Sequence, residues 1–530
     1  MPAPQRSEAA TASLLDDLRS GFLVFLIALP LCLGIALASG FPPVAGVLTA
    51  IIGGILVSFL GHADLTIKGP AAGLIVIALG AVQELGQGDP VLGYKRALAV
   101  GVVAAGVQIG FALFRVASVG AVMSPSVVHG MLAAIGVIIM AKQLHTVVGA
   151  VPEAKEPLEL LAELPHSIAH ANPEVLLLGV LSLLILFGMP LLRSRWLSRV
   201  PAPLVVLVVT VPLGIYFDLG HHHVYRFWGD TFQIGPEWLV TLPGSLWGAI
   251  AFPDFSMIWT ATSLKYVVMY ALVGTIESTL SVIAVDAITP ERKPSNLNRD
   301  LLGVGVGNLA TASIGGLPMI SEIVRSKANV DAGARSRFAN FFHGVFLLAF
   351  VALAPGLLHH IPLAALAAML VYTGARLASP AELVHVTKIG SDQLMLFMTT
   401  LIVTLATDLL VGVAAGLVLK VVLHWVRGAS PRSLTRTELD QKQEGDEVCL
   451  AIRGPAAFTS LLRVRNAVAS IGPDCKKVVI DLSQATLVDH TFLSGLDTLS
   501  GELEAALVVE GLDRMRGTSS HPHATRRRVA

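Results

Sequence analysis

Charged side chains are scarce in this sequence of 530 residues: Asp, Glu, Lys and Arg make up 14% of it, against about 25% in ordinary soluble domains. Hydrophobic residues make up 54%, which excludes a water-soluble protein of ordinary composition. The 37 basic and 37 acidic side chains leave no net charge, so the composition supports neither a nucleic-acid partner nor an acidic tail. We therefore predict a membrane protein that does not bind nucleic acid.

Cysteine is nearly absent as well. Cys32, Cys449 and Cys475 are too few and too scattered for a disulfide framework or a zinc site. The sequence also lacks a recognisable nucleophile with its base, a phosphate-binding loop and a metal-ligand cluster. These absences argue against an enzyme and against a resident cofactor or metal.

Long hydrophobic runs fill the first 426 residues. A helix needs about 20 apolar residues to cross a membrane, and the clear candidates are 21–38, 43–60, 97–114, 126–141, 174–191, 203–217, 266–284, 339–358, 361–375 and 393–425. The last run is long enough for two helices. Two more stretches, 69–83 and about 301–330, are interrupted by Gly, Pro and polar residues, so we predict about 12 to 14 crossings.

Arginine and lysine are unevenly spread over the loops. The long loop 219–263 contains only Arg226, whereas Arg335, Arg337 and Arg376 fall in loops on the side of the N-terminus. Because cytoplasmic loops collect basic residues, we expect both termini to be cytoplasmic. The first 20 residues show no cleavable signal, so the first span is expected to direct insertion into a bacterial-type plasma (inner) membrane.

The two interrupted stretches have a similar layout. From Pro30 to Pro70 is 40 positions and from Glu277 to Pro318 is 41, and each path passes through a Gly-rich helix. Such segments in corresponding positions of two halves indicate a substrate site where the N-termini of half-helices meet near the midplane. Backbone amides and positive dipole ends there would attract an anion without a metal. The residues expected to bind it are Lys68, Gly69, Pro70, Ala71 and Ala72 in the first segment, and Pro318, Met319, Ile320, Ser321 and Arg325 in the second.

Several charged residues lie within these apolar runs, where a charge is costly and usually functional. Arg325, with Lys68, is expected to balance the charge of the substrate. Glu277, with Ser281 one helical turn later, is expected to bind a coupling cation or proton. Glu322 lies three residues before Arg325 and could pair with it. The alternative is a buried structural ion network, or side chains that reach the membrane interface.

Four motifs occur together in the chain. They are Ile27-Ala28-Leu29-Pro30-Leu31, Gly69-Pro70-Ala71-Ala72-Gly73, Gly315-Gly316-Leu317-Pro318 followed by Arg325, and Thr407-Asp408-Leu409-Leu410-Val411-Gly412. On these motifs the sequence resembles the SulP anion permeases, whose members include sulfate permeases, cyanobacterial bicarbonate transporters and prestin. The resemblance covers nearly the whole chain.

The resemblance implies an all-α polytopic membrane protein of fourteen segments, built as two inverted repeats of seven, with a core domain that moves against a gate domain. It implies anion binding between the third and tenth segments, here 69–83 and about 318–330. Arg325 matches the tenth-segment arginine of many members, and Glu277 matches the eighth-segment carboxylate associated with coupling. Ser281 resembles a hydroxyl that helps to hold sodium in the bicarbonate transporters. Relatives are commonly dimers, so a homodimer surrounded by membrane lipid is expected.

Three residues depart from the family pattern. Ile323 stands where sodium-dependent relatives have a hydroxyl, Lys68 replaces a small or polar residue, and Glu322 is an additional carboxylate. A pair between Lys68 and Glu322 would leave the net charge nearly unchanged. Proton coupling through Glu277 therefore stays open beside sodium coupling, since burial favours the neutral form of a carboxyl group.

The pattern changes after the hydrophobic part. From residue 447 strand-like and helix-like stretches alternate, which predicts a small α/β domain, and Asp481-Leu482-Ser483 with Val488-Asp489 resembles the STAS domain of the family. We expect a cytoplasmic N-terminus at 1–19, a transmembrane transport domain at 20–426, a linker at 427–446, the STAS-like domain at 447–516 and a basic tail at 517–530. The run 526–528 of three arginines is expected to be a solvated end, with contact to anionic lipid as the alternative.

These features together predict a secondary active transporter of a small inorganic anion, with bicarbonate favoured over sulfate. It would work by alternating access, coupled to Na+ or H+ through Glu277. A sulfate permease and an uncoupled anion exchanger or channel on the same scaffold are the alternatives. A nucleobase-type permease shares the two-repeat architecture, but the segment 447–511 argues against it.

Overall fold

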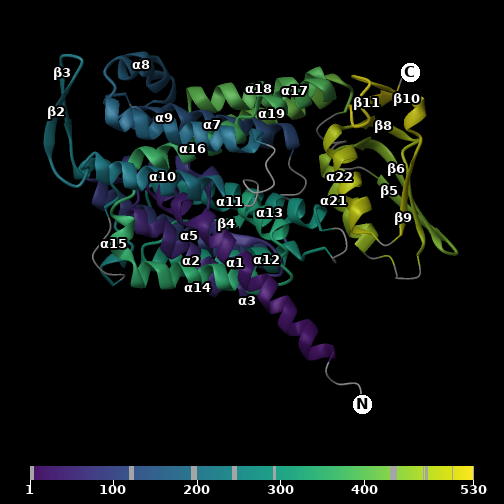
Figure 1. The fold of residues 1–530 in the computed structure, drawn as a ribbon. Coiled ribbons are helices and arrows are strands. Elements are labelled where there is room, and N and C mark those ends of the chain that lie inside the picture. Colours follow the sequence, from purple (N-terminus) through teal and green to yellow (C-terminus); the bar gives the residue numbers. More distant parts are fainter. Residues whose placement is uncertain are drawn as a thin grey trace. The chain divides into compact units, whose positions relative to one another are not determined.

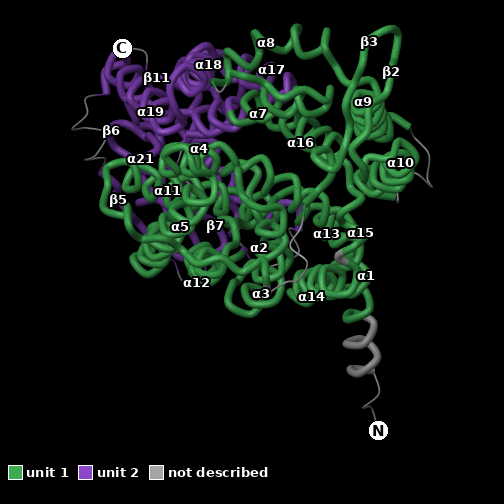
Figure 2. The backbone as a smooth tube through the Cα atoms, turned by 90° about the vertical axis from the view of Figure 1, so that its left-hand side faces the viewer, with its two compact units in different colours: residues 1–117, 135–285, 295–377 green, residues 118–134, 286–294, 378–530 purple. Residues whose placement is uncertain are grey.

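A computed structural model describes most of the chain. The described residues are 5–117, 124–154, 156–192, 200–241, 247–289, 294–429, 438–469, 471, 475–503 and 505–528, so parts of the predicted N-terminus, linker and tail lie outside them. The chain forms two compact units (Figure 2), which are residues 1–117, 135–285 and 295–377, and residues 118–134, 286–294 and 378–530. Helices α7 and α11 contribute to both.

The first unit is almost entirely helical (Figure 1). Its helices are α1 (Gln5–Ala38), α2 (Pro43–Ile55), α3 (Val57–Leu60), α4 (Ile75–Gly86), α5 (Pro90–Leu113), α7 (Pro125–Val147), α8 (Pro157–Ala169), α9 (Pro173–Gly188), α10 (Ala202–Tyr216), α11 (Ala261–Ala287), α12 (Leu297–Ile314), α13 (Ile323–Asp331), α14 (Phe338–Leu353), α15 (Pro355–Leu358) and α16 (Leu363–Leu377). An antiparallel hairpin, β2 (His223–Phe227) and β3 (Asp230–Ile234), follows α10.

Membrane-spanning character follows from length and composition. Within the described ranges, eight helical stretches are long and apolar enough to cross a bilayer, and four shorter apolar helices accompany them. All the clear hydrophobic runs predicted from the sequence are helical, and the run 393–425 contains two helices, as its length predicted. The stretch 301–330 is different, because most of the helix α12 lies within it. That helix ends where Gly315 adopts a left-handed φ of 102°.

Small residues let helices α2 and α14 approach closely. Gly54 of α2 meets Gly344 of α14, and a Cβ on Gly54 would lie 2.6 Å from the Cα of Gly344. Backbones can come this near only where side chains are small. Around this contact, buried side chains of α1, α2, α14 and α16 form one hydrophobic core, which includes Phe25, Leu33 and Leu347. This core supports the helices that carry the site described below.

The second unit combines helices α17 (Pro380–Ile389), α18 (Ser391–Ala406) and α19 (Leu409–Val426) with a mixed sheet. The sheet order is β10-β11-β8-β6-β7-β9, and β5 pairs with β6. The pairs β6–β7, β6–β8 and β7–β9 are parallel, and the others are antiparallel. The strands are β5 (Glu438–Glu444), β6 (Glu447–Ala456), β7 (Lys477–Asp481), β8 (Ala485–Val488), β9 (Ala506–Glu510), β10 (Met515–Gly517) and β11 (Arg526–Arg528). Helices α21 (Phe458–Ala469) and α22 (His490–Glu502) lie side by side against the sheet (Figure 1).

This sheet extends beyond residues 447–516 at both ends. Strand β5 precedes that range, and β11 follows it within the predicted basic tail. Strand β11 pairs with β10 on one side and with β8 on the other. The three arginines 526–528 therefore form an internal strand, a position that their charge alone did not indicate.

A buried ion pair joins α19 to this α/β domain. Lys420 Nζ lies 3.3 Å from Asp489 Oδ2 and donates to Thr491 Oγ1 at 2.6 Å, while His424 Nε2 lies 3.2 Å from the same carboxylate. Asp489 also caps α22 by accepting from the amide of Phe492 at 2.7 Å. Burial alone would raise the pKa of Asp489, but Lys420 and His424 outweigh it and hold that pKa well below its usual range.

Candidate functional site

The two interrupted segments meet as a small antiparallel sheet. Strand β1 (Ile67–Pro70) pairs with β4 (Met319–Glu322), with Lys68 opposite Ser321 and Gly69 opposite Ile320. A short 3-10 turn, η1 (Ala72–Leu74), and α4 follow β1, and α13 follows β4. The sequence therefore correctly predicted that these segments come together.

Neither Pro70 nor Pro318 is the first residue of a half-helix. Pro70 is the last residue of β1, and Pro318 comes just before β4. The amide of Ala71 donates to the carbonyl of Pro318 at 3.4 Å, so the chain stays extended there and the helical turns begin at Ala72 and Ile323. Two helix N-termini still flank the small sheet.

Side chains from neighbouring helices hold the two strands. Asn308 of α12 accepts from the amide of Met319 at 2.6 Å and donates to its carbonyl at 3.1 Å. Ser278 of α11 accepts from the amide of Ser321 at 3.1 Å, and Ser326 of α13 accepts from the amide of Ile67 at 2.8 Å. The sequence did not point to these three side chains. Asn308 and Ser278 are polar residues inside otherwise apolar or glycine-rich stretches, which was a usable signal, whereas Ser326 lies in a polar stretch and gave none.

Arg325 is fully buried and its charge is paired. Its Nε lies 3.0 Å from Glu322 Oε2, and its Nη2 lies 3.2 Å from Glu322 Oε1, as the spacing of three residues predicted. The guanidinium also approaches the carbonyl of Pro70 and the thiol of Cys32, each at 3.4 Å. A Cβ on Gly69 would lie 2.5 Å from Nη1, so glycine at this position makes room for the arginine.

Glu277 lies on the other side of the same glycine-rich segment. Its side chain is 7% exposed, and its Oε1 is buried without a hydrogen-bond partner among the described residues. A Cβ on Gly73 would collide with this carboxylate, so glycine is required there as well. Ser281, one turn later on α11, is buried at 8% exposure. The segment 69–73 thus runs between a paired arginine and an unpartnered carboxylate oxygen.

Lys68 pairs with Asp300 and not with Glu322, which corrects the predicted cross-segment pair. Lys68 Nζ lies 3.1 Å from Asp300 Oδ1, and both side chains are 2% exposed. The reason is the strand register: directly opposed residues of an antiparallel pair share a face, and successive residues alternate. Lys68 therefore shares its face with Ser321, whose hydroxyl also donates to Asp300 at 3.0 Å, while Glu322 points to the other face.

Asp300 was missed in the sequence, although an acid in the first turn of a glycine-rich apolar helix was a usable signal. It also accepts from the amides of His62 and Ala63 at 3.1 and 2.9 Å. Lys68 and Ser321, both predicted to bind substrate, thus have polar atoms already committed to this carboxylate. The other predicted residues are Gly69, Pro70, Ala71, Ala72, Pro318, Met319 and Ile320, which offer backbone groups and apolar side chains.

Four of the five charged side chains of the site form ion pairs. Lys68 with Asp300 and Arg325 with Glu322 form two neutral pairs, which leaves the carboxylate of Glu277. Within the described residues, the site therefore holds no unpaired positive side chain. Any anion bound here depends on helix N-termini and backbone amides for its first attraction.

We expect Gly73→Ala to impair transport because the added methyl group must displace the carboxylate of Glu277. Overpacking of this kind costs about 1–3 kcal/mol. If this cost destabilises the anion-bound state, the uptake rate should fall by roughly 5- to 150-fold. Initial uptake rates in proteoliposomes measure the effect. Gly106→Ala is the matched control, since a Cβ there meets nothing within 4 Å. Equal uptake rates for Gly73→Ala and Gly106→Ala would contradict the close contact between Gly73 and the carboxylate of Glu277.

A double-mutant cycle tests the pair of Lys68 and Asp300. Removing one partner leaves the other charge buried, so Lys68→Met and Asp300→Asn should each lower stability by about 3–5 kcal/mol. The double variant should lose less than the sum, with an interaction of about 0.5–3 kcal/mol. Thermal unfolding in detergent gives all four values, and additive losses would show that the pair is not an energetic unit.

Comparisons with known proteins identify the family of the chain. Residues 14–400 match the model of the sulfate permease family. The chain is 25% identical to the protein named "Putative sulfate transporter YvdB" of Bacillus subtilis, over 84% of this chain and 81% of that protein. It is also 25% identical to the bicarbonate transporter BicA of Synechocystis, over 93% and 86% of the two chains.

Two solved structures share the fold. The transmembrane domain of a cyanobacterial bicarbonate transporter BicA aligns with a TM-score of 0.64 at 24% identity, covering 76% of this chain and 97% of that one. The structure of SLC26A9 aligns with a TM-score of 0.68 at 14% identity, covering 94% and 85%. The protein is thus a helical multi-span membrane protein of this fold, and its C-terminal α/β domain is consistent with STAS. The chain belongs to the sulfate permease family, a family of inorganic-anion transporters and not of enzymes.

Proposed function

We propose that the protein is a secondary active transporter of a small monovalent inorganic anion, with bicarbonate as the substrate and Glu277 as the coupling group. The observation that carries the proposal is the arrangement of charged side chains around the antiparallel pair of β1 and β4. Both buried cations of this site, Lys68 and Arg325, are neutralised by carboxylates, and Glu277 has a buried oxygen without a partner among the described residues.

The anion would bind where α13 and the turn η1 begin. Unpaired amides and the positive ends of helix dipoles favour negative charge there, by about 0.3–1 kcal/mol at an exposed end and more where the site is partly buried. Arg325 adds a guanidinium, but Glu322 already neutralises it. Among the described residues, this site has no unpaired cation that could offset the second negative charge of sulfate. The arrangement therefore favours a monovalent anion such as bicarbonate over divalent sulfate.

Coupling would follow from electrostatic repulsion. An ionised Glu277 opposes an anion bound at the same glycine-rich segment, and a proton or Na+ on Glu277 removes that opposition. The anion and the coupling ion would then each increase the affinity for the other, which is the thermodynamic basis of symport. Ser281 offers one hydroxyl to a sodium ion, one turn away on α11, whereas Ile323 offers none. The proposal therefore includes both H+ and Na+ as coupling ions.

The wider architecture is part of the same proposal. The corresponding positions of β1 and β4 after their Gly-rich helices support two inverted repeats of seven segments, in which a core carrying this site moves against a gate. The distribution of loop arginines supports two cytoplasmic termini in a bacterial-type inner membrane. A homodimer embedded in membrane lipid is the assembly that we expect, by analogy with relatives.

Sulfate is the second candidate substrate, because the relatives bear names of both sulfate and bicarbonate transporters. Uptake of labelled bicarbonate and of labelled sulfate into proteoliposomes separates the two. The assay is run at alkaline pH and short times, so that little CO2 crosses the bilayer. We expect saturable bicarbonate uptake that excess unlabelled sulfate inhibits weakly. Rapid sulfate uptake that bicarbonate fails to inhibit would reject the assignment.

A further inference from the structure

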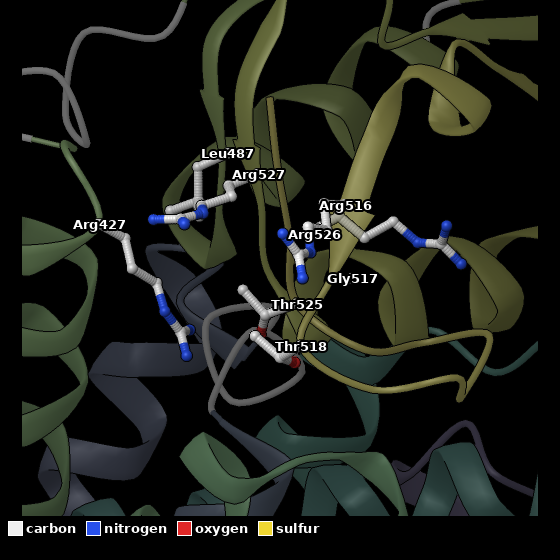
Figure 3. A pocket seen from close by; sticks show the side chains of 8 residues that line it. All are labelled: Arg427, Leu487, Arg516, Gly517, Thr518, Thr525, Arg526 and Arg527. Carbon is white, nitrogen blue, oxygen red and sulfur yellow. The ribbon is translucent and has the colours of Figure 1, made fainter. Parts of the chain in front are cut away.

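A basic cavity lies in the second unit (Figure 3). It has a volume of about 200 Å³ and lies among the end of α19, strand β8 and the β10–β11 pair. Its lining consists of Arg427, Leu487, Arg516, Gly517, Thr518, Thr525, Arg526 and Arg527. Four of these residues are arginines, and none is an acid.

Within the described part of the chain, one of the four arginines has a carboxylate partner. Arg427 Nη1 lies 2.9 Å from Asp392 Oδ2, and the hydroxyl of Thr525 donates to the same oxygen at 2.7 Å. Arg526 Nη2 donates to the carbonyl of Pro522 at 3.2 Å, but its Nε is buried without an acceptor in the described part of the chain. A buried donor left unsatisfied costs about 1–3 kcal/mol, more for a charged group.

The strand register adds a second unfavourable feature. Arg516 of β10 is directly opposite Arg527 of β11, and like charges in directly opposed positions destabilise a sheet. Neither has a carboxylate partner among the described residues. Figure 3 shows their side chains extending in different directions, with Arg427, Arg526 and Arg527 around the hollow. Arg526 and Arg527 therefore border the hollow without a carboxylate partner among the described residues, and Arg427 borders it with its partner Asp392.

We propose that this cavity binds a phosphate-bearing anion, which satisfies Arg526 and Arg527 and connects β11 to Arg427 at the end of α19. Planar guanidinium groups bind phosphate oxygens through paired hydrogen bonds, and the hydroxyl of Thr518 lies on the same lining. The volume is below the range of about 300–1,000 Å³ typical of pockets for drug-sized ligands. It suits a single phosphate group or a lipid headgroup better than a whole nucleotide.

Two sources could supply that chemistry. One is the headgroup of an anionic phospholipid, because Trp425 and Val426, which precede Arg427 on an apolar helix, are 64% and 78% exposed, and aromatic residues mark membrane interfaces. The other is free phosphate in solution. In either case the ligand holds the last membrane helix to the C-terminal sheet, so its loss would loosen that connection.

The test uses the full-length protein in neutral, phosphate-free detergent solution. Its unfolding temperature is measured while inorganic phosphate is titrated, and separately while phosphatidylglycerol is added against phosphatidylcholine. We expect a saturable rise of several degrees with phosphate, with phosphatidylglycerol, or with both. A response to phosphate alone identifies a soluble ligand, and a response to phosphatidylglycerol alone identifies a lipid headgroup.

Variants assign the response to the cavity. Arg526→Gln and Arg527→Gln should each raise the half-saturating ligand concentration by about tenfold, as expected for the loss of a charge-assisted hydrogen bond. Arg528→Gln is the matched control, since Arg528 is on the same strand but does not line the cavity. No response to either ligand, or the same response in all three variants, would overturn the proposal.

Arg516→Gln gives a measurement that does not depend on ligand binding. It removes one of the two opposed charges, so it should raise the unfolding temperature in anion-free buffer. A lower unfolding temperature in that buffer would contradict an unfavourable pairing of Arg516 with Arg527 across β10 and β11.

Discussion

Glu277→Gln is expected to abolish gradient-driven accumulation of the anion while leaving the fold intact. Glutamine has the size of the glutamate and fits against Gly73, but it can neither release a proton nor neutralise Na+. The repulsion between the carboxylate and the anion, and its relief by the coupling ion, both disappear. Coupling free energies between sites are typically 1–3 kcal/mol, so the coupling ion should raise the anion affinity of the wild type by about 5- to 150-fold, and this increase should be absent in Glu277→Gln.

The measurement is anion uptake into proteoliposomes with and without an imposed gradient. Downhill flux should persist in Glu277→Gln, because the anion site itself keeps its amides and dipoles. Glu159→Gln provides the control, since Glu159 is an exposed residue of α8 and should behave as wild type. Accumulation that survives in Glu277→Gln would show that this carboxylate carries no coupling ion, and would support the exchanger or channel alternative.

Glu322→Gln is expected to change the preference of the site from monovalent to divalent anions. The substitution leaves the buried guanidinium of Arg325 without its counter-charge. In anion-free buffer this should lower stability by about 3–5 kcal/mol. Bound anion should restore much of that loss, because it replaces the missing carboxylate beside Arg325.

Sulfate should benefit most, since its second charge would now meet an unpaired cation. A hydrogen bond to a charged group contributes about 1.5–3 kcal/mol, so the ability of sulfate to inhibit bicarbonate uptake should increase by about 10- to 150-fold. Glu322→Asp keeps the charge and should retain the wild-type selectivity. If sulfate inhibits wild type and Glu322→Gln equally, the pair does not set the charge of the site.

The sequence predicted the large features of the fold because their signals are local. Each long apolar run became a helix, and the alternation after residue 447 became a mixed α/β domain. The pairing of Arg325 with Glu322 was also predictable, because residues three apart on a helix or its first turn are neighbours. These inferences need no knowledge of which segments meet in space.

Features that depend on strand register could not be predicted. Lys68 seemed a reasonable partner for Glu322 until the antiparallel register put their side chains on opposite faces of the β1–β4 pair. The same register presents Lys68 to Asp300, a residue 232 positions away in the sequence. Similarly, nothing local marks the arginines 526–528 as partners of β8 and β10, so their strand pairing could not be predicted, although Arg527 and Arg528 are exposed to solvent.

The most direct test of the transport mechanism is the steady-state accumulation of labelled bicarbonate in proteoliposomes, with sodium and proton gradients imposed one at a time. We predict that one of the two gradients drives bicarbonate above its equilibrium level in the wild type, and that Glu277→Gln reaches equilibrium only. Bicarbonate that only equilibrates in the wild type under both gradients would contradict coupled transport through Glu277.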